Sequence, residues 1–292
     1  MTAVEATAQR KHYEAAYQES DNSWGFPDRM ITDGHELNNR TILCLGSGAG
    51  SDVWFLAVNN LVVGVDYALS GLKVGARHRL RSVQSDLNLS ARLPFCDGAF
   101  DVVVCKDILE HLVDPLTILR EVKRVIRNEG YIVLNLPNHF FLPMRLRLLL
   151  GKGLRWRTLG ADHTRDFQEW DYMHLRFFTY RGLCQMLATA GLRVEKWFWD
   201  LGTIAYYNNP DRWLEPQLWK RANGLPISPR GIMGLRVLLP LWRVFNALFP
   251  RHLRSSFVSL SPGLLCASFY CHLRSSDPRS LEVGGGSSEA EG

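Results

Sequence analysis

The sequence predicts an α/β fold built on a doubly wound, Rossmann-like parallel sheet that has helices on both faces. From residue 41 onward, short apolar runs alternate with helix-like segments, which is the order of elements in βαβ units. The runs are apolar at nearly every position, and strands of this kind are buried on both sides of a sheet. Both observations argue against an all-α or an all-β arrangement.

Several segments are expected to form strands. Besides four clear apolar runs, a weaker one lies near Val83. After a helix that Gly191 ends, the run at 192–199 is typical of a strand, and the run at 264–273 is expected to be the final one. The four clear runs are ILCL at 42–45, LVVGV at 61–65, FDVVVC at 100–105 and YIVLNL at 131–136.

Helices are expected between these strands. The segment 115–127 has Leu116, Leu119, Val122 and Val125 at helical spacing, so one face of that helix is expected to be apolar. The other helices are expected at 52–58, 68–79 and 180–190.

The rest of the chain is expected to surround this core. Residues 138–178 lose the alternation, which predicts a cap inserted over the carboxyl edge of the sheet. The expected divisions are a lead-in with lid helices at 1–40, the core at 41–199 with its cap insertion at 138–178, an irregular and amphipathic helical cap at 200–263, a final core strand at 264–274 and a disordered tail at 275–292.

The segment 232–249, IMGLRVLLPLWRVFNALF, is apolar at most positions. It is a poor transmembrane span, because Arg236, Arg243 and Pro240 are costly in hydrocarbon. The two arginines are seven residues apart and therefore share one face of an amphipathic helix. Two interpretations stay open: the helix packs on the protein with its arginines outward, or it contacts a membrane surface or acts as a lipid-facing lid.

Composition limits the class of protein. Of the 292 residues, 46% are hydrophobic and 22% are charged, as in ordinary globular chains and unlike fibrous or disordered ones. The net charge of +5 permits an anionic substrate, a lipid surface or RNA. Since there is no RNA-binding signature and no zinc-knuckle spacing, a nucleic-acid partner is not expected.

The six cysteines are scattered, and none forms a CxxC pair. No metal site is therefore expected, and most of the cysteines are expected to be small core residues. The N-terminal residues contain no apolar stretch of the kind found in a secretory signal. These features predict a reducing, cytoplasmic location, with any membrane association at the periphery.

A glycine-rich turn follows the first expected strand. Gly46, Gly48 and Gly50 come directly after the apolar run, and a helix-like segment comes next. Glycines allow a sharp turn and a close approach of the backbone to a ligand. Because Ser51 follows, the pattern is G-x-G-x-G and not the G-x-G-x-x-G of dinucleotide sites, which favours an adenosyl cofactor over a pyrophosphate. A purely structural turn is the alternative.

Two acidic residues follow in the order that an adenosine requires. Asp66 ends the run LVVGV, where a carboxylate can accept hydrogen bonds from both ribose hydroxyls. Asp86 precedes Leu87, so the acid can bind the adenine amino group while the leucine packs on the ring. Each acid alone is weak evidence, since acids at strand ends are often solvated. Their order and spacing relative to the glycine turn support the prediction.

Two later motifs are more specific. They are CKDILEHLVDP at Cys105–Pro115 and NEGYIVL at Asn128–Leu134. Together with the glycine turn, they resemble class I S-adenosylmethionine-dependent methyltransferases, especially the small-molecule branch that includes quinone-biosynthesis enzymes. The resemblance implies a sheet of seven strands with the last strand antiparallel. It also implies S-adenosylmethionine as cofactor and methyl transfer to an O, N or C acceptor on a small molecule or a lipid or glycan precursor.

The resemblance further implies roles for individual residues. The glycine turn would hold the methionine part of the cofactor, and acids at the strand ends would bind its adenosine. The implied cofactor contacts are Gly46, Gly48 and Gly50 for the methionine part, Asp66 for the ribose, Asp86 and Leu87 for the adenine, Lys106 and Asp107 beside the sulfonium, and Ser47 and Tyr67 without an assigned part of the cofactor.

One position departs from the family pattern. An acid usually stands two residues before the first glycine, where it organises the amino-acid end of the cofactor, but this chain has Cys44. The departure is compatible with weaker binding, with compensation by another acid such as Asp52, or with loss of activity.

Histidines are the candidate catalytic residues. An oxygen acceptor requires a base for its proton, and the pKa of His is suited to neutral pH. His139 and His174 are the preferred candidates, and His163 lies in the same expected cap. For each of them a structural role is the alternative, as it is for His111 in the family motif.

Two other functions stay open beside an active methyltransferase. One is a catalytically inactive, methyltransferase-like binding protein, and the other is an NAD-dependent oxidoreductase, which the glycine pattern disfavours. The Trp-rich, Arg-bearing cap permits an aromatic, isoprenoid, glycan or lipid-linked acceptor.

Overall fold

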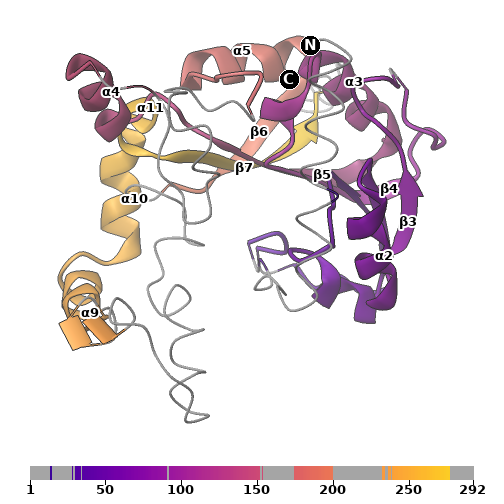
Figure 1. Cartoon of the computed structure of the whole chain (residues 1–292), viewed down its shortest axis with the longest axis horizontal. Coiled ribbons are helices and arrows are strands. Elements are labelled where there is room, and N and C mark those ends of the chain that lie inside the picture. The colour runs from indigo at the N-terminus through magenta and orange to yellow at the C-terminus, as the bar shows by residue number, and fades with distance from the viewer. Residues whose placement is uncertain are drawn as a thin grey trace, which may run out of the picture.

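The computed structural model (Figure 1) has a sheet of seven strands at its centre. It describes residues 14, 28, 30–33, 35–90, 92–151, 153, 174–199, 232–233, 236–237 and 239–276. The strands lie in the order β3-β2-β1-β4-β5-β7-β6. Their bounds are β1 Thr41–Leu45, β2 Leu61–Asp66, β3 Arg81–Gln84, β4 Phe100–Lys106, β5 Ile126–Pro137, β6 Leu192–Trp197 and β7 Ser268–Ser275.

The strand directions confirm the predicted fold class. β1 pairs in parallel with β2 and β4, β2 pairs in parallel with β3, and β4 pairs in parallel with β5. β7 runs antiparallel to both of its neighbours, β5 and β6. Because the chain order reverses between β1 and β4, a crevice is expected outside the carboxyl ends of these strands.

Helices cover both faces of the sheet (Figure 1). α3 and α5 pack against one face, whereas α2 and the 3-10 helix η1 lie against the other. The bounds of the helices are η1 Trp54–Val58, α2 Leu69–Arg77, η2 Leu109–His111, α3 Pro115–Val125, α4 Leu142–Leu149, α5 Tyr180–Thr189, α9 Leu239–Leu248, α10 Arg251–Ser259 and α11 Pro262–Leu265.

Alternate residues of β1 enter two separate cores. Leu43 and Leu45 are fully buried on the face that α3 and α5 cover. Ile42 and Cys44 are buried in the core on the opposite face. Successive side chains of a strand point to opposite faces, so a central strand covered on both sides has to be apolar throughout. This explains why the run ILCL shows no polar alternation.

The helix expected at 115–127 is confirmed as α3, although it ends two residues earlier. Asp114 caps its first turn through its side chain, and Pro115 occupies the first helical position, where a missing N–H costs nothing. β5 starts directly after it at Ile126, so Gly130 lies within the strand. A Cβ on Gly130 would lie 2.7 Å from the carbonyl oxygen of Asp101, which excludes a larger residue there.

The structure differs from two expectations drawn from the sequence pattern. The final strand begins at Ser268 and not at residue 264, because Pro262–Leu265 form α11 with a proline in the first turn. The segment expected to be irregular after Pro137 contains α4, which also begins with a proline in its first turn. Short apolar runs do not distinguish strands from buried helical turns.

Other predicted segments lie largely outside the described residues. They include most of the lead-in, His163, the block 200–231 and the tail after residue 276. Part of the amphipathic segment 232–249 is described and contains α9. The division of the chain into domains stays a prediction. Within the described ranges, no helix combines the length and the apolar character needed to cross a bilayer.

The described part of the lead-in contacts the sheet and its helices. Ile31 is fully buried, and its carbonyl accepts a hydrogen bond from the Tyr131 hydroxyl at 2.9 Å. The carboxylate of Glu14 accepts hydrogen bonds from the amides of Leu69 and Ser70 at 2.8 and 3.0 Å. α2 has no side-chain cap of its own, so Glu14 supplies the acceptors that the first turn of this helix requires.

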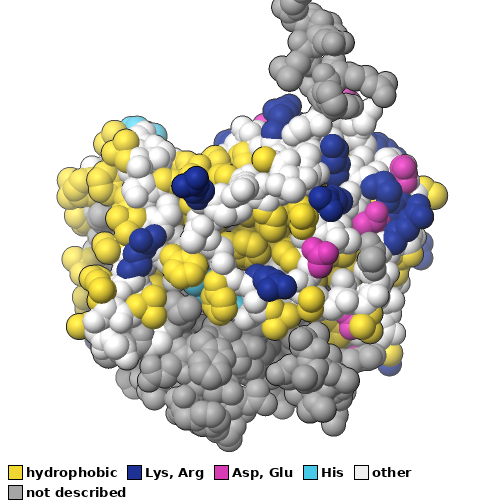
Figure 2. Space-filling model, turned by 90° about the horizontal axis from the view of Figure 1, so that it is seen from above, with side chains coloured by type: hydrophobic (Ala, Val, Ile, Leu, Met, Phe, Trp, Pro, Cys, Tyr) yellow, Lys and Arg dark blue, Asp and Glu magenta, His cyan; other side chains and the backbone are white. Residues whose placement is uncertain are grey.

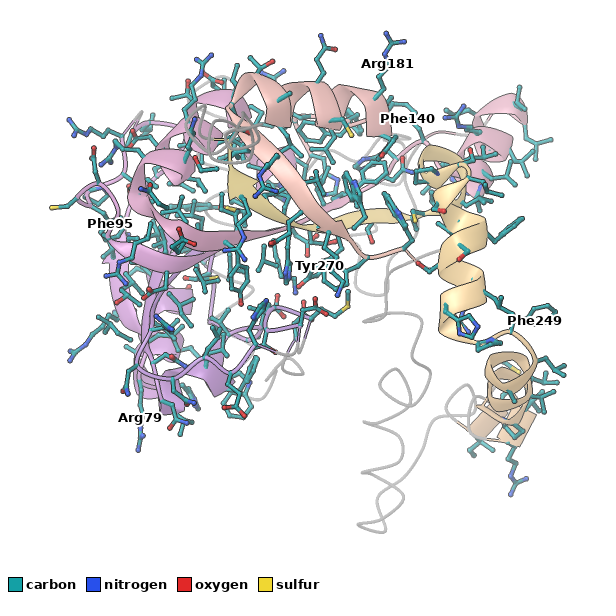
Figure 3. The ribbon with its side chains drawn as sticks, turned by 180° about the vertical axis from the view of Figure 1, so that it is seen from behind. Arg79, Phe95, Phe140, Arg181, Phe249 and Tyr270 are labelled. Carbon is teal, nitrogen blue, oxygen red and sulfur yellow. The ribbon has the colours of Figure 1, made fainter. Side chains whose placement is uncertain are left out.

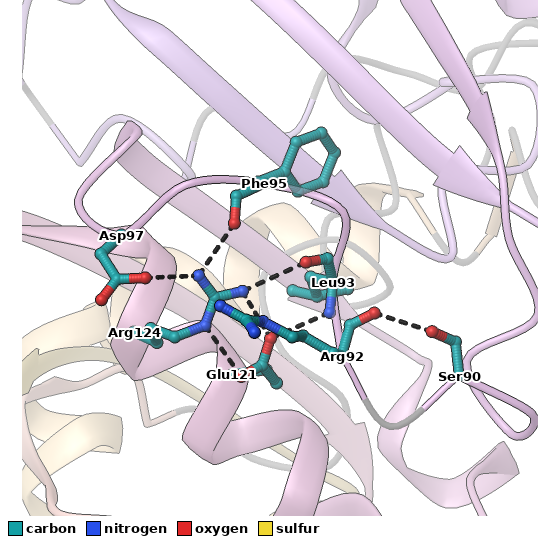
Figure 4. A network of polar contacts seen from close by, with 7 residues as sticks. All are labelled: Ser90, Arg92, Leu93, Phe95, Asp97, Glu121 and Arg124. Atoms are coloured by element: carbon teal, nitrogen blue, oxygen red, sulfur yellow. Dashed lines mark hydrogen bonds and ion pairs between the residues drawn. The ribbon is translucent and has the colours of Figure 1, made fainter.

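An arginine fixes the loop that leads into β4 (Figure 4). Arg124, on α3, donates to the carbonyls of Leu93 and Phe95 at 3.1 and 2.8 Å. The same guanidinium pairs with Asp97 and Glu121, each at 2.6 Å. Only a planar fork of donors can satisfy all four acceptors at once. The contact therefore holds the loop against the helix.

We expect Arg124→Lys to destabilise the fold by about 2 kcal/mol, because an ammonium cannot reach the two carbonyls and the two carboxylates together. Chemical denaturation followed by circular dichroism measures the change. Arg120→Lys, on the same helix but exposed, is the matched control and should change the free energy of unfolding little. Equal stability of the two variants would contradict the assigned role.

Candidate active site

A pocket opens at the carboxyl ends of the parallel strands. It lies outside β1, β2 and β4, where the reversal of chain order predicts a ligand crevice. Side chains that follow β3 complete one wall. The lining residues are Gly46, Asp66, Tyr67, Ser85, Asp86, Leu87, Asn88, Asp107, Ile108, His111 and Leu112.

The glycine turn borders this pocket through Gly46. Gly46, Gly48 and Gly50 all have positive φ angles, of 64°, 49° and 75°. A Cβ on Gly46 would lie 2.7 Å from the side chain of Ile108, which lines the same pocket. A residue with a side chain is therefore disfavoured at Gly46, both by the positive φ angle and by the lack of space beside Ile108. Gly46 lines the pocket, whereas Gly48 and Gly50 shape the turn behind it.

Asp66 holds the turn in place from the end of β2. Its Oδ2 accepts a hydrogen bond from the amide of Gly48, and its Oδ1 accepts one from the amide of Ala68, both at 2.8 Å. Burial raises the pKa of Asp66, and hydrogen bonds from the Ala68, Gly48 and Tyr67 amides oppose this shift. The carboxylate thus lines the pocket and also links the ends of β1 and β2.

A second acid, Asp86, lines the same pocket. Asp86 Oδ1 accepts a hydrogen bond from the amide of Asn88 at 2.9 Å. Asn88 in turn donates to the His111 carbonyl at 3.2 Å and accepts from the Val113 amide at 2.7 Å. The two carboxylates predicted to bind an adenosine therefore line one pocket, together with Leu87 and Tyr67.

Asp107, which also lines the pocket, has a strained backbone. Its φ is 50°, which is uncommon for a residue with a side chain. Asn135 holds it from β5: the Asp107 amide donates to the Asn135 carbonyl at 2.9 Å, and the Asn135 side chain donates to the Asp107 carboxylate at 2.8 Å. Desolvation of the carboxyl group raises the pKa of Asp107, and the positive charge of Lys106 opposes that shift.

Lys106, predicted to lie beside the sulfonium, is not among the residues that line the pocket. Its ammonium lies 2.7 Å from Asp28 and 2.8 Å from Asp52, on the other face of the sheet from α3. These carboxylates raise the pKa of Lys106 against the opposing effect of burial. A direct contact between Lys106 and a cofactor stays a prediction. Ser47 likewise turns its hydroxyl toward Gly64 and not into the pocket.

Cys44, which stands where the family usually has an acid, lies near this ion-paired cluster. Burial, followed by the charge of Asp52, raises the pKa of the Cys44 thiol well above its usual value, so the thiol is neutral. Asp52 and Asp28 both pair with Lys106, and compensation for the missing acid stays a prediction. Asp52, named from the sequence as a compensating acid, is therefore near Cys44.

The candidate histidines lie beside the pocket and contact one another. His139 Nε2 is 2.8 Å from His174 Nδ1, so these two imidazoles share a hydrogen bond. The ring of His174 also lies 4.7 Å from that of His111, which lines the pocket. His174 Nε2 is 4.0 Å from the buried carboxylate of Glu110. The structure brings together two histidines that are 35 residues apart in the sequence.

Part of the histidine cluster has the composition of a metal site. One ligand atom each from Glu110, His111 and His174 lies within 4.8 Å of the others. Two histidines and a glutamate can hold a divalent ion such as zinc. The sequence-based expectation of no metal site considered cysteine spacing and did not foresee that distant histidines would meet.

Sequence reasoning named most of the pocket but missed several residues. Asn88, Ile108 and Leu112 line it without having been predicted, and Asn135 positions Asp107 from a neighbouring strand. A partial signal existed for Asn88, which lies two residues after Asp86. The contact made by Asn135 depends on strand pairing and had no local signal.

Comparison with known proteins identifies the class. Residues 43–134 match the family model described as a methyltransferase domain. The chain is 32% identical over 197 residues to the ubiquinone biosynthesis O-methyltransferase of Chromobacterium violaceum, a match that covers 60% of this chain and 79% of the relative. This chain belongs to the S-adenosylmethionine-dependent methyltransferases. It is accordingly an enzyme of this class with S-adenosylmethionine as its cofactor.

One further relative and one solved structure are similar to this chain. The corresponding enzyme of Thiobacillus denitrificans is 27% identical over 202 residues, which are 62% of this chain and 83% of the relative. The crystal structure of the 4+2 cyclase SpnF aligns with a TM-score of 0.50 at 15% identity and covers 91% of this chain and 94% of its own. At this identity, the similarity to the cyclase shows the fold alone.

We expect Asp66→Ala to weaken S-adenosylmethionine binding at least about tenfold, because a buried acceptor of two backbone amides is lost and the glycine turn is released. Isothermal titration calorimetry measures the affinity. Glu36→Gln removes one negative charge from an exposed position and is the control. Unchanged affinity in a folded Asp66→Ala variant would show that Asp66 does not organise the site.

Proposed function

We propose that this methyltransferase transfers a methyl group to a hydroxyl oxygen of a small, lipid-like or aromatic acceptor. In this proposal the pocket beside the glycine turn binds the cofactor, and the hydrogen-bonded pair His139 and His174 receives the proton of the acceptor. The observation that carries the proposal is the position of this pair next to a pocket that already contains two carboxylates at strand ends.

The pocket residues fit an adenosyl cofactor. Asp66 and Asp86 offer carboxylate oxygens for ribose hydroxyls and for an adenine amino group, and Leu87 offers an apolar surface for the ring. The absence of a Cβ at Gly46 leaves the space that the turn requires next to Ile108. When bound, S-adenosylmethionine supplies the methyl group from its sulfonium. Holding the cofactor and the acceptor in line is the main contribution of the protein to such a displacement.

The histidine pair is suited to hold a proton. A hydroxyl acceptor has to lose its proton as the new bond to carbon forms, so a base is needed close to it. If His174 takes the proton, its Nδ1–H can donate to His139 Nε2, and the charge on the ring faces the Glu110 carboxylate at 4.0 Å. In this proposal the protonated His174 ring lies between two buried side chains, those of His139 and Glu110.

Oxygen is the favoured acceptor atom for two reasons. The two similar enzymes from Chromobacterium violaceum and Thiobacillus denitrificans are named O-methyltransferases. The candidate base pair is also superfluous for an acceptor that is already a free nucleophile, such as a neutral amine. We further propose a reducing, cytoplasmic location, which is supported by the free thiol state of all six cysteines.

Two measurements test the proposed function. Isothermal titration with S-adenosylmethionine and with NAD should give binding of the first and none of the second. Mass spectrometry of pooled metabolites and lipid extracts, incubated with enzyme and cofactor, should reveal a product that has gained one methyl group on oxygen. Cofactor binding without any methylated product would favour an inactive descendant, and a product methylated on nitrogen or carbon would overturn the acceptor assignment.

We expect His174→Asn and His139→Asn each to lower kcat roughly a hundredfold or more while leaving the affinity for S-adenosylmethionine within about threefold, because the base acts on the acceptor and not on the cofactor. Steady-state kinetics on the identified acceptor and calorimetry provide the two readouts. His78→Gln, at the end of α2 and outside the pocket, is the control. A variant that loses both activity and cofactor binding would indicate a structural role.

Removal of metal by a chelator tests whether the proton step needs a bound ion. We expect dialysis against EDTA to leave methyl transfer unchanged, because the hydrogen-bonded imidazoles can take the proton without an ion. Activity and metal content are measured before dialysis, after it, and after addition of zinc or magnesium. Loss of activity that one divalent ion restores would assign the proton step to a metal bound by Glu110, His111 and His174.

A further inference from the structure

Exposed apolar side chains gather on one side of this protein. Of the 21 large hydrophobic side chains that are exposed in the described part of the chain, five lie in residues 142–150 and ten in residues 232–260. The first of these segments contains α4, and the second contains α9 and α10. Scattered exposed leucines are ordinary on a protein surface, but a concentration of this kind marks a binding surface.

The exposed side chains form stripes along the helices. On α4, Leu142, Leu146 and Leu149 are 41%, 50% and 82% exposed. Their spacing of four and three residues places them on one helical face. The same spacing repeats on α9, where Leu241, Val244 and Leu248 are 58–66% exposed.

Exposed apolar side chains continue from α9 onto α10, past the corner between the two helices. Arg254 is buried and donates to the carbonyl of Phe249, at the end of α9, at 2.7 Å. Phe249, labelled in Figure 3, lies at this corner and is half exposed. Leu253 and Phe257 follow on α10 at a spacing of four and are both more than half exposed. The hydrogen bond from Arg254 thus joins the end of α9 to α10, and both helices carry exposed apolar side chains.

Acidic residues are absent from the two stretches of sequence that contain these helices. Residues 216–276 contain eight Lys or Arg and no Asp or Glu, and residues 130–161 contain five Lys or Arg and no Asp or Glu. The chain as a whole has 34 basic and 29 acidic residues, so two acid-free stretches of this length stand apart from the rest. In Figure 2, the end of the molecule that carries α4 shows yellow side chains with dark blue ones among them, and the magenta acids gather toward the other end.

We infer that α4, α9 and α10 form a docking surface for an anionic lipid membrane. Their exposed leucine, valine and phenylalanine side chains would enter the boundary between headgroups and acyl chains. Arginines beside the stripes, such as Arg145, Arg147 and Arg236, would contact lipid phosphates. Helices with an apolar face and an arginine-bearing flank bind membranes in this orientation, parallel to the surface.

The dimensions of the helices agree with docking and not with spanning. α9 has ten residues, which corresponds to about 15 Å of helix and is half of the hydrocarbon thickness of a bilayer. A membrane explains the acid-free stretches better than a second copy of the chain, because two copies would bring arginine-rich surfaces together without acidic partners. The repulsion between like charges would oppose such a dimer.

The surface adjoins the candidate active site. Leu142, the first residue of α4, is three residues after His139, and the ring of Phe177 lies 4.7 Å from that of His139. Docking through α4 would therefore place the histidine pair next to the membrane interface. An acceptor with a lipid tail could reach the pocket without leaving the bilayer. This consequence for the acceptor rests on the proposed function, whereas membrane docking itself does not.

Vesicle sedimentation with the full chain tests the inference. We expect the protein to bind vesicles that contain phosphatidylglycerol, to bind pure phosphatidylcholine vesicles much less, and to be released from the anionic vesicles by salt. Absence of binding to anionic vesicles, in a protein that still binds S-adenosylmethionine, would overturn the membrane inference and leave the proposed function intact. Vesicle binding without cofactor binding would overturn the proposed function and leave the membrane inference intact.

Matched variants locate the surface. Leu146→Glu with Leu149→Glu on α4, and Leu241→Glu with Leu248→Glu on α9, should each weaken vesicle binding roughly tenfold or more. The control pair is Leu61→Glu with Leu89→Glu, which are 48% and 86% exposed outside these helices. Equal loss in the control pair would mean that added negative charge, and not the apolar stripe, is responsible.

The contribution of the arginines is tested separately. Arg145→Gln with Arg147→Gln should weaken binding to anionic vesicles and leave residual binding to neutral ones unchanged, whereas the exposed pair Arg79→Gln with Arg193→Gln should have little effect. Light scattering gives the oligomeric state of each variant. A wild-type dimer that the leucine variants dissociate, with no vesicle binding in either, would overturn the inference in favour of a second copy of the chain.

Discussion

The pair of hydrogen bonds that Asp66 accepts from the amides of Gly48 and Ala68 is the constraint on which the site depends. The glycines of the turn have positive φ angles, so no local side-chain preference keeps the backbone in place. A buried carboxylate that accepts two amides supplies this restraint from the neighbouring strand. It also joins the ends of β1 and β2 to the start of α2, where Glu14 caps the first turn.

A group of three charged side chains lies on the face of the sheet opposite α3. Lys106 lies between Asp28 and Asp52, close to the neutral thiol of Cys44. A buried lysine of this kind requires acids around it, because an unpaired charge in the interior is costly. The chain supplies them from the lead-in and from the turn after Gly50. Asp28 and Ile31, in the described part of the lead-in, are thus buried on this face of the sheet.

The fold alone does not decide the chemistry. The same architecture is present in a cyclase, which aligns over most of its length with this chain. The assignment to the methyltransferases therefore rests on the family match and on sequence identity, and the acceptor atom is argued from the histidine pair. The apolar helices outside the core add a separate feature, because a surface of this kind concerns where the enzyme meets its acceptor and not how the methyl group moves.

The sequence by itself determined the α/β class, the glycine turn and the acids at the strand ends, because these depend on local periodicity and on residues that follow strands directly. It did not distinguish the helix α11 from the start of a strand, since short apolar runs occur in both. Only the tertiary structure decided that His139 contacts His174, that Asn135 holds Asp107, and that Lys106 faces Asp28 and Asp52. Each of these contacts joins residues far apart in the chain, and strand pairing and helix packing, which have no local signal, determine which of them meet.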